Sequence, residues 1–268
     1  MFQLTPVVKI LLIINIGFYL ASLAFGAPFN EMMSLYYFES EKFQVHQLLT
    51  HFFMHGSFIH ILFNMIGLVL FGSYIENFWG KQKFIILYFV CAFGAAAIHT
   101  GADYYKLNPQ IETIQSFQRE PDANTFSRFF TSSNEEILSS EGHQLVGELE
   151  SELRNGINPK AQGEAINLMN QVIRYQLNIP IVGASGAIYG IFVAFGILFP
   201  NMSLMFLFFP VPIKAKYLIP ALLCYDAVFG FNPMPGDFTG HFAHLGGAVF
   251  GIILTLYWTR NNNNYQVN

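Results

Sequence analysis

The chain has 268 residues, of which 53% are hydrophobic and only 11% are charged. Soluble domains carry roughly 25% charged residues, so this composition excludes an ordinary soluble protein and indicates a membrane protein. The net charge of -4 and the lack of basic clusters argue against a nucleic-acid-binding protein. Cys91 and Cys224 both stand in apolar runs, where we expect buried thiols rather than a disulfide.

Six apolar segments approach the roughly 20 residues that a membrane-spanning helix needs. In chain order, we place these spans at about Pro6–Ala27, Ser57–Ile75, Phe84–Thr100, Ile181–Pro200, Tyr217–Phe231 and Gly240–Trp258. We interpret the first as a retained span because no small-residue cleavage site clearly ends it. The aromatic stretch Glu31–Gln47 predicts an interfacial loop with short amphipathic helices. Met202–Ile213, which contains two prolines, predicts a short extended segment.

The character of the chain changes between the third and fourth spans, in residues 101–178. This stretch is rich in Glu, Gln, Asn and Ser and holds 11 acidic residues against 6 basic ones. Apolar residues recur near helical spacing in Asn134–Leu153 and Pro159–Leu177, which predicts an extramembrane insertion with two or three amphipathic helices. The chain then divides into residues 1–100 with three spans, the acidic insertion, residues 179–260 with three more spans, and the polar tail 261–268.

The basic residues of the short loops predict the orientation in the membrane. If the sides are numbered by alternation, the side of the N-terminus holds six of these residues: Lys9, Lys81, Lys83, Lys214, Lys216 and Arg260. The short loops of the other side hold only Lys42. Because basic residues gather in cytoplasmic loops, we expect both termini in the cytoplasm and the insertion outside.

A serine and a histidine both stand inside apolar runs. Ser185 lies between Gly183 and Gly186, which let another backbone approach and leave the hydroxyl bare at a helix start. His244 stands at the start of the sixth span, on the same predicted side and at the same depth as Ser185. Polar side chains in such positions are functional candidates by default, and a nucleophile needs a base.

A polar cluster lies on and just before the second span. His60 and Asn64 are four residues apart, so they share a helix face and can donate to an oxyanion together with the Ser185 backbone N–H. His51 and His55 have the same spacing, and we favour a structural, hydrogen-bonding role for them. A histidine pair also suits a metal, but no HExxH motif and no carboxylate-rich partner accompany it. We therefore expect no metal and no cofactor.

Two further polar residues are weighed and set aside. Asp226, in the fifth span, is a candidate to orient the histidine as in a Ser-His-Asp triad, but a lone carboxylate near the outer end of a span is more often structural or water-facing. His241 lies one turn before His244 and is a rival for the base. We keep His244 because Gly246 and Gly247 follow it and permit close helix packing.

Together these segments resemble the rhomboid family of intramembrane serine proteases. Residues 51–64, HFFMHGSFIHILFN, are similar to the H-x-x-x-H-x-x-x-x-H-x-x-x-N second helix of that family. Residues 183–186 are similar to its G-x-S-G, and residues 243–247 to its A-H-x-x-G. More weakly, Glu76 resembles a structural acid at the inner end of the second helix. The insertion departs from the simplest bacterial rhomboid and is not covered by the resemblance.

The resemblance implies an all-α, polytopic membrane protein with a six-helix rhomboid-like bundle and an extramembrane helical insertion. It implies a serine endopeptidase with Ser185 as nucleophile, His244 as general base, and His60, Asn64 and the Ser185 amide as the oxyanion hole. The substrates would be single-span membrane proteins, cut near the membrane surface, and the enzyme would need no cofactor. We expect a multi-pass protein of the cell (inner) membrane, with its active site open to the outer face.

Two alternatives belong to other classes. A catalytically inactive rhomboid-like protein that binds or escorts membrane clients would lack the serine or the histidine, and both are present here. A transporter would be favoured by inverted repeats and by charges at the middle of the membrane, and the sequence shows neither.

Overall fold

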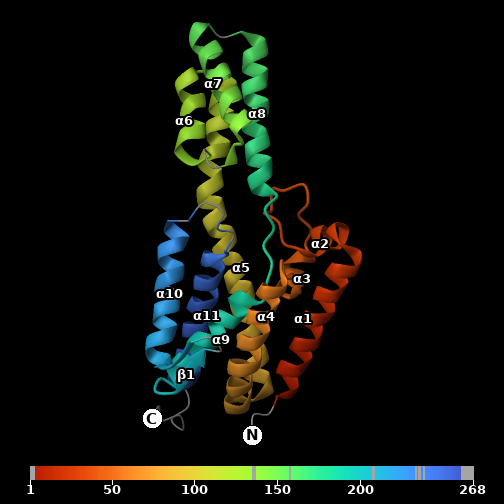
Figure 1. The fold of residues 1–268 in the computed structure, drawn as a ribbon, viewed down its shortest axis with the longest axis vertical. Coiled ribbons are helices and arrows are strands. Elements are labelled where there is room, and N and C mark those ends of the chain that lie inside the picture. The colour runs from red at the N-terminus through yellow and green to blue at the C-terminus, as the bar shows by residue number, and fades with distance from the viewer. Residues whose placement is uncertain are drawn as a thin grey trace. The chain divides into compact units, whose positions relative to one another are not determined.

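The computed structural model describes residues 4–134, 137–156, 158–206, 209–232, 234, 237 and 239–260. The polar tail 261–268 lies outside the described residues. The chain separates into two compact units (Figure 1). Unit 1 contains residues 1–35, 42–100 and 180–268, and unit 2 contains residues 36–41 and 101–179. The boundary falls inside the long helix α5, Ser73–Arg119.

Unit 1 consists mainly of helices that pack around one apolar core, which confirms the all-α fold class. Its further elements are α1 Pro6–Phe25, α2 Ala27–Met33, α3 Gln47–Thr50, η1 His51–Phe53, α4 Phe58–Gly67, η2 Leu68–Gly72, α9 Ser185–Leu198, β1 Ser203–Phe206, β2 Phe209–Lys214, α10 Ala215–Phe231 and α11 His241–Arg260. The two strands pair antiparallel, with Ser203 opposite Lys214, where the sequence predicts an extended segment.

The predicted second and third spans occur as one nearly continuous helical path with a break at Gly80. Ser57 caps the start of α4 by accepting from the His60 backbone N–H, and a π-helical turn, η2, leads into α5. Gly80 has φ 81°, a conformation that glycine adopts without a steric penalty, so the chain turns there. The helix itself does not end with the predicted third span at Thr100 but continues to Arg119 through Pro109, whereas the boundary between the two compact units does fall after Thr100.

The burial of apolar side chains in unit 2 explains why α5 continues past that proline. Pro109 removes one backbone hydrogen bond from the helix. Beyond it, however, Ile114 and Phe117 enter the core of unit 2, where Phe117 is fully buried. The rest of that core comes from α6 Ala123–Ser133, α7 Ser140–Asn155 and α8 Pro159–Leu177.

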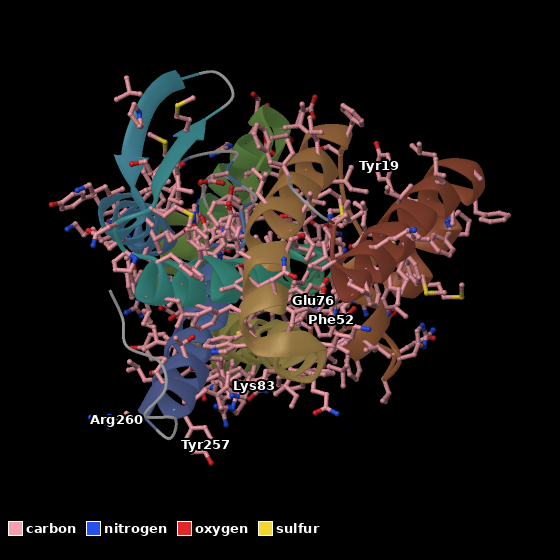
Figure 2. The ribbon with its side chains drawn as sticks, turned by 90° about the horizontal axis from the view of Figure 1, so that it is seen from below. Tyr19, Phe52, Glu76, Lys83, Tyr257 and Arg260 are labelled. Atoms are coloured by element: carbon pink, nitrogen blue, oxygen red, sulfur yellow. The ribbon has the colours of Figure 1, made fainter. Side chains whose placement is uncertain are left out.

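Unit 1 exposes apolar side chains on the outward faces of its helices, as a protein surrounded by lipid does. Within the described residues, the stretches Pro6–Phe25, Phe58–Arg119 and His241–Arg260 are long and apolar enough to cross a membrane. The predicted fourth and fifth spans, α9 and α10, have only 14 and 17 residues. Figure 2 shows Glu76 inside unit 1, and its two carboxylate oxygens accept hydrogen bonds from the N–H groups that open α1.

Candidate active site

Ser185 is the first residue of α9, and the chain that leads to it is held by backbone hydrogen bonds. Leu35 and Ile181 exchange two such bonds, of 3.1 and 2.7 Å. Two residues further on, the Gly183 N–H donates to the His51 carbonyl at 2.9 Å. These bonds fix the position at which α9 begins. The Ser185 N–H then lies in the first helical turn, where backbone N–H groups have no intrahelical acceptor.

Gly183 shows how closely His60 approaches the serine. A Cβ atom added to this glycine would lie 2.8 Å from His60 Nε2 and 3.6 Å from Ser185 Oγ. The φ of Gly183 is 120°, a conformation that other residues rarely adopt. The imidazole of His60 and the hydroxyl of Ser185 therefore lie beside the same backbone position, which only glycine suits.

Glycines bring α9 and α11 into backbone contact. A Cβ on Gly247 would lie 1.8 Å from the Gly186 carbonyl oxygen, and one on Gly251 would lie 2.7 Å from the Gly190 Cα. The close approach of two helices at small residues is a common mode of packing in membranes. Because Gly186 follows Ser185 directly and Gly247 lies three residues after His244, this contact brings the two predicted catalytic residues to one interface.

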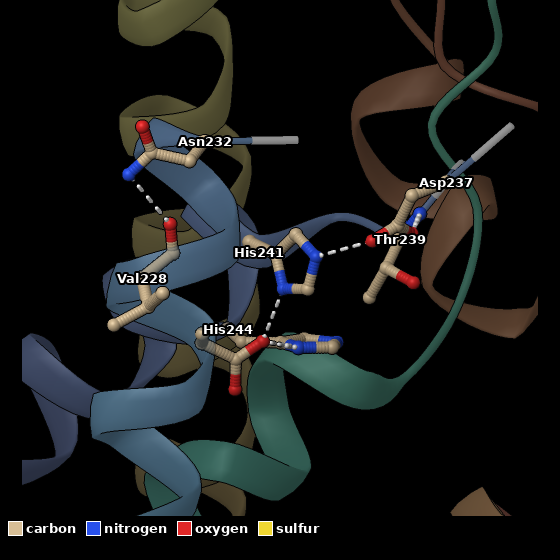
Figure 3. Close-up of polar contacts among 7 residues, drawn as sticks. Val228, Asn232, Asp237, Thr239, His241 and His244 are labelled. Carbon is tan, nitrogen blue, oxygen red and sulfur yellow. Dashed lines mark hydrogen bonds and ion pairs between the residues drawn. The ribbon is translucent and has the colours of Figure 1, made fainter. Parts of the chain in front are cut away.

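The His244 ring is held from two sides. The Tyr189 ring, one turn after Ser185 on α9, stacks on it with a centroid distance of 4.1 Å and an angle of 7° between the planes. His244 Nδ1 lies 2.8 Å from Asp226 Oδ1 on α10. Asp226 is 1% exposed, and the same oxygen lies 2.7 Å from His241 Nδ1. Figure 3 draws the contacts of the two histidines with the carboxylate of Asp226 as dashed lines and continues them from His241 to Asp237.

Asn64 carries a buried donor that no described residue satisfies. Its side chain is 7% exposed, and no atom in the described ranges accepts from Nδ2. Buried donors in proteins are nearly always paired, so such a group is a candidate for binding a ligand or a transition state. It lies one turn after His60 on α4, on the same face. His60 and Asn64 are thus donors of the type that an oxyanion hole uses.

His51 and His55 make contacts within the protein that position their neighbours. His51 Nδ1 lies 2.6 Å from the Gln47 carbonyl, and the His51 carbonyl receives the Gly183 N–H. The His55 ring packs edge-on against His60 at 5.0 Å. Both rings are 3% exposed, and burial lowers the pKa of each from the usual 6.5 to about 4. Both side chains are therefore neutral at physiological pH.

The residues around His244 also have the composition of a metal site. Asp226, His241 and His244 each offer one ligand atom, and these three atoms lie within 4.8 Å of one another. His and carboxylate ligands suit Zn²⁺. The same atoms also satisfy one another by hydrogen bonds of 2.7 and 2.8 Å, which requires no ion.

The structure brings most of the predicted site together and adds two residues to it. Ser185 and His60 both lie close to Gly183, Gly186 contacts Gly247 of α11, and His244 at the start of α11 stacks on Tyr189 of α9. Asn64 lies one turn after His60 on α4, the His55 ring packs against His60, and the His51 carbonyl accepts from the Gly183 N–H. Glu76 lies apart, at the start of α1. The sequence analysis left out Asp226 and did not single out Tyr189. The sequence feature that could have indicated Tyr189 is its position one helical turn after Ser185. For Asp226, it is the short loop that connects the end of α10 to the start of α11, where His244 lies.

Comparisons with known proteins identify the family of this chain. Residues 42–107 and 160–261 match the sequence profile of the Rhomboid domain. The chain is 38% identical over 58 residues to Rhomboid-like protein 15 of Arabidopsis thaliana, covering 22% of this chain and 14% of that protein. It is 36% identical over 78 residues to Rhomboid protein 1, mitochondrial, of Saccharomyces cerevisiae, covering 29% and 22%. It is 32% identical over 114 residues to RHOMBOID-like protein 12, mitochondrial, of Arabidopsis thaliana, covering 41% and 33%.

The fold and the site define a polytopic helical membrane protein with a serine and a histidine at one helix interface. The profile match covers more than half of the residues, and the chain belongs to the rhomboid family. It is a multi-pass membrane protein. The chain spans at most a third of the length of these three relatives. The profile match leaves out residues 108–159, which lie in unit 2.

Proposed function

We propose that this protein is an intramembrane serine endopeptidase that cuts single-span membrane proteins near the membrane surface. The observation that carries the proposal is the meeting of a serine and two histidines. The His60 imidazole and the Ser185 hydroxyl both lie close to Gly183. The His244 ring stacks on Tyr189, which lies one turn after Ser185 on α9. Family membership supports the same activity.

In the proposed reaction, Ser185 Oγ attacks the carbonyl carbon of the peptide bond while His244 Nε2 accepts its proton. His60, the Asn64 amide and the Ser185 N–H stabilise the resulting oxyanion. The C–N bond then breaks, and His244 returns the proton to the leaving amine. A water molecule, activated by the same histidine, hydrolyses the acyl-enzyme and releases the second product. The chemistry uses only side chains of this chain and needs no cofactor.

The distribution of basic residues supports a membrane orientation with both termini in the cytoplasm. Lys83 Nζ lies 5.6 Å from the Trp258 ring, so the break at Gly80 and the end of α11 with Arg260 lie at one end of unit 1. Glu76 joins the start of α1, which carries Lys9, to the same end. In this orientation, the site at the start of α9 opens to the outer face of the membrane. For a bacterial protein, the membrane in question is the inner membrane.

The proposed function also assigns a role to each part of the chain. Residues 1–100 and 179–260 form the protease domain, and residues 101–178 form an extramembrane helical insertion. The lipid bilayer and single-span substrates are the partners, and we expect no nucleic acid.

The alternative function is that of an inactive rhomboid-like protein that binds or escorts membrane clients. The presence of Ser185, His244, His60 and Asn64 in this chain favours the protease.

The test is cleavage of a single-span reporter whose outer end is destabilised as a helix. Purified wild type is compared with Ser185→Ala and His244→Ala in liposomes that contain a chelator. We expect cleavage by wild type alone, because loss of the nucleophile in a serine hydrolase costs on the order of a millionfold in rate. Cleavage by the Ser185→Ala protein would contradict the serine mechanism, and loss of wild-type cleavage with the chelator would indicate a metalloenzyme.

A fluorophosphonate probe separates an unsuitable reporter from an inactive protein. The probe labels activated serines, so it should label wild type but not Ser185→Ala. Labelling without cleavage would show that the reporter is a poor substrate. Wild type that neither cleaves the reporter nor reacts with the probe would favour the binding or escort function.

A further inference from the structure

The contacts of Asp226 go beyond a Ser-His dyad. Its Oδ1 atom lies 2.8 Å from Nδ1 of His244 and 2.7 Å from Nδ1 of His241. An ionised carboxylate only accepts hydrogen bonds, so each of these ring nitrogens donates to it. At 1% exposure, Asp226 meets almost no solvent, and a buried carboxylate persists only where it is paired.

This arrangement determines which nitrogen of His244 is the base. With Nδ1–H donated to Asp226, the lone pair of the neutral ring is on Nε2, the nitrogen that takes the serine proton in the proposed reaction. A flip of the ring would replace Nδ1 by a carbon and lose the bond to Asp226. The Tyr189 ring, stacked at 4.1 Å, holds the plane of the imidazole. The ring is thus fixed in both tautomer and orientation.

The second histidine lies between two carboxylates. His241 Nδ1 faces Asp226 Oδ1, and its Nε2 lies 3.0 Å from Asp237 Oδ2. A neutral imidazole has one N–H, whereas two acceptors require two, so His241 is the imidazolium cation. Asp237 lies outside the helices, and hydrogen bonds from Thr239 and His241 lower its pKa to about 2, so it is ionised at neutral pH. The cation balances part of the charge that Asp226 carries.

Aromatic side chains also lie against the two histidine rings. On α9, Tyr189 stacks on His244, and on α10, Tyr225 lies 5.9 Å from the His241 ring. Along the described hydrogen bonds that join the two rings, the charged groups are Asp226, Asp237 and the His241 cation. These three alternate in sign.

We propose that Asp226 is the positioning carboxylate of His244, and that His241, held as a cation between Asp226 and Asp237, keeps Asp226 in place. The proposal rests on the proposed function, because it assigns Asp226 and His241 to the base of that reaction. Asp226 and His241 act through His244 and contact no reacting atom. The same three residues would instead be ligands if the site held Zn²⁺, so the test includes added metal.

The test measures kcat and KM of Asp226→Asn in liposomes, with Asp122→Asn as the matched control. Asp122 also accepts two hydrogen bonds, but it does so at the cap of α6 in unit 2. In serine proteases, the Asp→Asn change of a triad lowers kcat by about 10⁴, so we expect a loss between about a hundredfold and ten-thousandfold with KM unchanged. The control should keep wild-type kcat and KM.

Two further variants grade the effect. His241→Gln keeps a donor to Asp226 but removes the positive charge, and Asp237→Asn removes only the outermost partner. We expect the loss of kcat to fall in the order Asp226→Asn, His241→Gln, Asp237→Asn. A kcat for Asp226→Asn within threefold of wild type, in a preparation that Ser185→Ala inactivates, would overturn the positioning role and leave the proposed function intact. Inhibition by a chelator and recovery with Zn²⁺ would overturn it in favour of a metal site.

A spectroscopic measurement on the wild-type side chains remains decisive if Asp226→Asn does not fold. Nitrogen-15 NMR of labelled histidines reports which ring nitrogens carry protons, and His241→Gln and His244→Ala assign the two signals. At pH 7 we expect the Nδ1–H tautomer for His244 and two protonated nitrogens for His241. A neutral His241, or the Nε2–H tautomer of His244, would overturn the proposal whatever the activity of the variants.

Discussion

The two compact units differ in the hydrogen bonding of their buried amide side chains. In unit 2, Gln176 Nε2 donates to Asn134 Oδ1 at 2.8 Å and to Gln110 Oε1 at 3.2 Å. Asn134 and Gln110 in turn donate to backbone carbonyls. In unit 1, Asn64 Nδ2 is as deeply buried but lacks an acceptor in the described ranges. The other buried amide side chains of that unit, those of Asn15 and Gln47, have acceptors for their donors.

The core of unit 2 and the site in unit 1 also differ in packing. The core of unit 2 is filled by large, fully buried side chains such as Phe117, Phe126 and Met169. At the site in unit 1, the backbones of α9 and α11 are in contact at Gly186 and Gly247, and the neighbouring side chains Ser185 and His244 are polar. The comparison teaches that unit 2 pairs the N–H donors of its buried amides, whereas unit 1 leaves the Asn64 donor unpaired where a transition state would use it.

The most damaging change should be Gly247→Leu, because a Cβ at this position already meets the Gly186 carbonyl oxygen at 1.8 Å. The side chain would force α11 away from α9, and overpacking of this kind lowers stability by about 1–3 kcal/mol. A displacement of 1 Å costs on the order of a hundredfold in rate, so we expect cleavage to fall by at least about a hundredfold in addition to the loss of stability. Gly17→Leu on α1 is the control, since no atom lies within 4 Å of the added Cβ. Cleavage of the reporter by both variants at equal rates would contradict the helix contact.

Asn64→Ala should lower kcat without lowering stability. Loss of one oxyanion donor costs about a hundred to a thousandfold in rate, whereas the removal of an unpaired buried amide leaves no partner unsatisfied. The measurement is kcat in liposomes together with thermal unfolding in detergent. Asn15→Ala is the control with the opposite result, since Asn15 Nδ2 donates to the Leu11 carbonyl. If Asn64→Ala unfolds more easily and cleaves normally, the amide has only a structural role.

Acid should destabilise unit 1 before it titrates most carboxylates. Burial lowers the pKa of His51 and of His55 to about 4, so the unfolded chain binds protons more readily than the folded one between pH 6.5 and 4. The stability that these neutral rings contribute is complete above pH 6.5 and is lost as the pH falls to about 4, by up to about 3 kcal/mol for each ring. Unfolding by denaturant across this pH range measures it. The variant His51→Gln/His55→Gln should show a flatter pH dependence, and an unchanged slope would contradict the assignment.

Gln176→Leu should have the smallest effect and should act on stability alone. The change leaves the Asn134 and Gln110 acceptors unpaired, which costs about 1–3 kcal/mol. We expect a lower melting temperature and a kcat equal to that of wild type. Gln144→Leu, at an exposed position on α7, is the control and should melt as wild type does. A lower kcat for Gln176→Leu would show that the amides of unit 2 influence the site.

Much of unit 1 could be predicted from the sequence because lipid imposes a simple rule on composition. Apolar runs near the length of a membrane span located the long helices of unit 1, although α9 and α10 have only 14 and 17 residues, and the glycines before and after Ser185 marked the place where α9 meets its neighbours. The extension of α5 past Thr100 could not be read in this way. Its continuation is stabilised by the burial of Phe117 among residues of α6 and α8, which lie far along the chain.

The role of Asp226 could not be predicted for a related reason. A carboxylate near the end of a span has the same sequence signature whether it faces water, a lipid headgroup or a histidine. The contact with His244 depends on the rotation of α10 against α11, and no short motif encodes that rotation. The spacing of His60 and Asn64 was informative because both residues lie on one helix, so its periodicity alone determines their common face.

The length of α9 has a consequence for the lipid around this protein. A helix of 14 residues is about 21 Å long, whereas the hydrocarbon core of a typical bilayer is about 30 Å thick. This hydrophobic mismatch leaves two arrangements: the Ser185 end lies within the hydrocarbon depth, or the bilayer is thinner beside it. In either arrangement, the acyl-chain length of the surrounding lipid sets how far a peptide bond must descend to meet the serine.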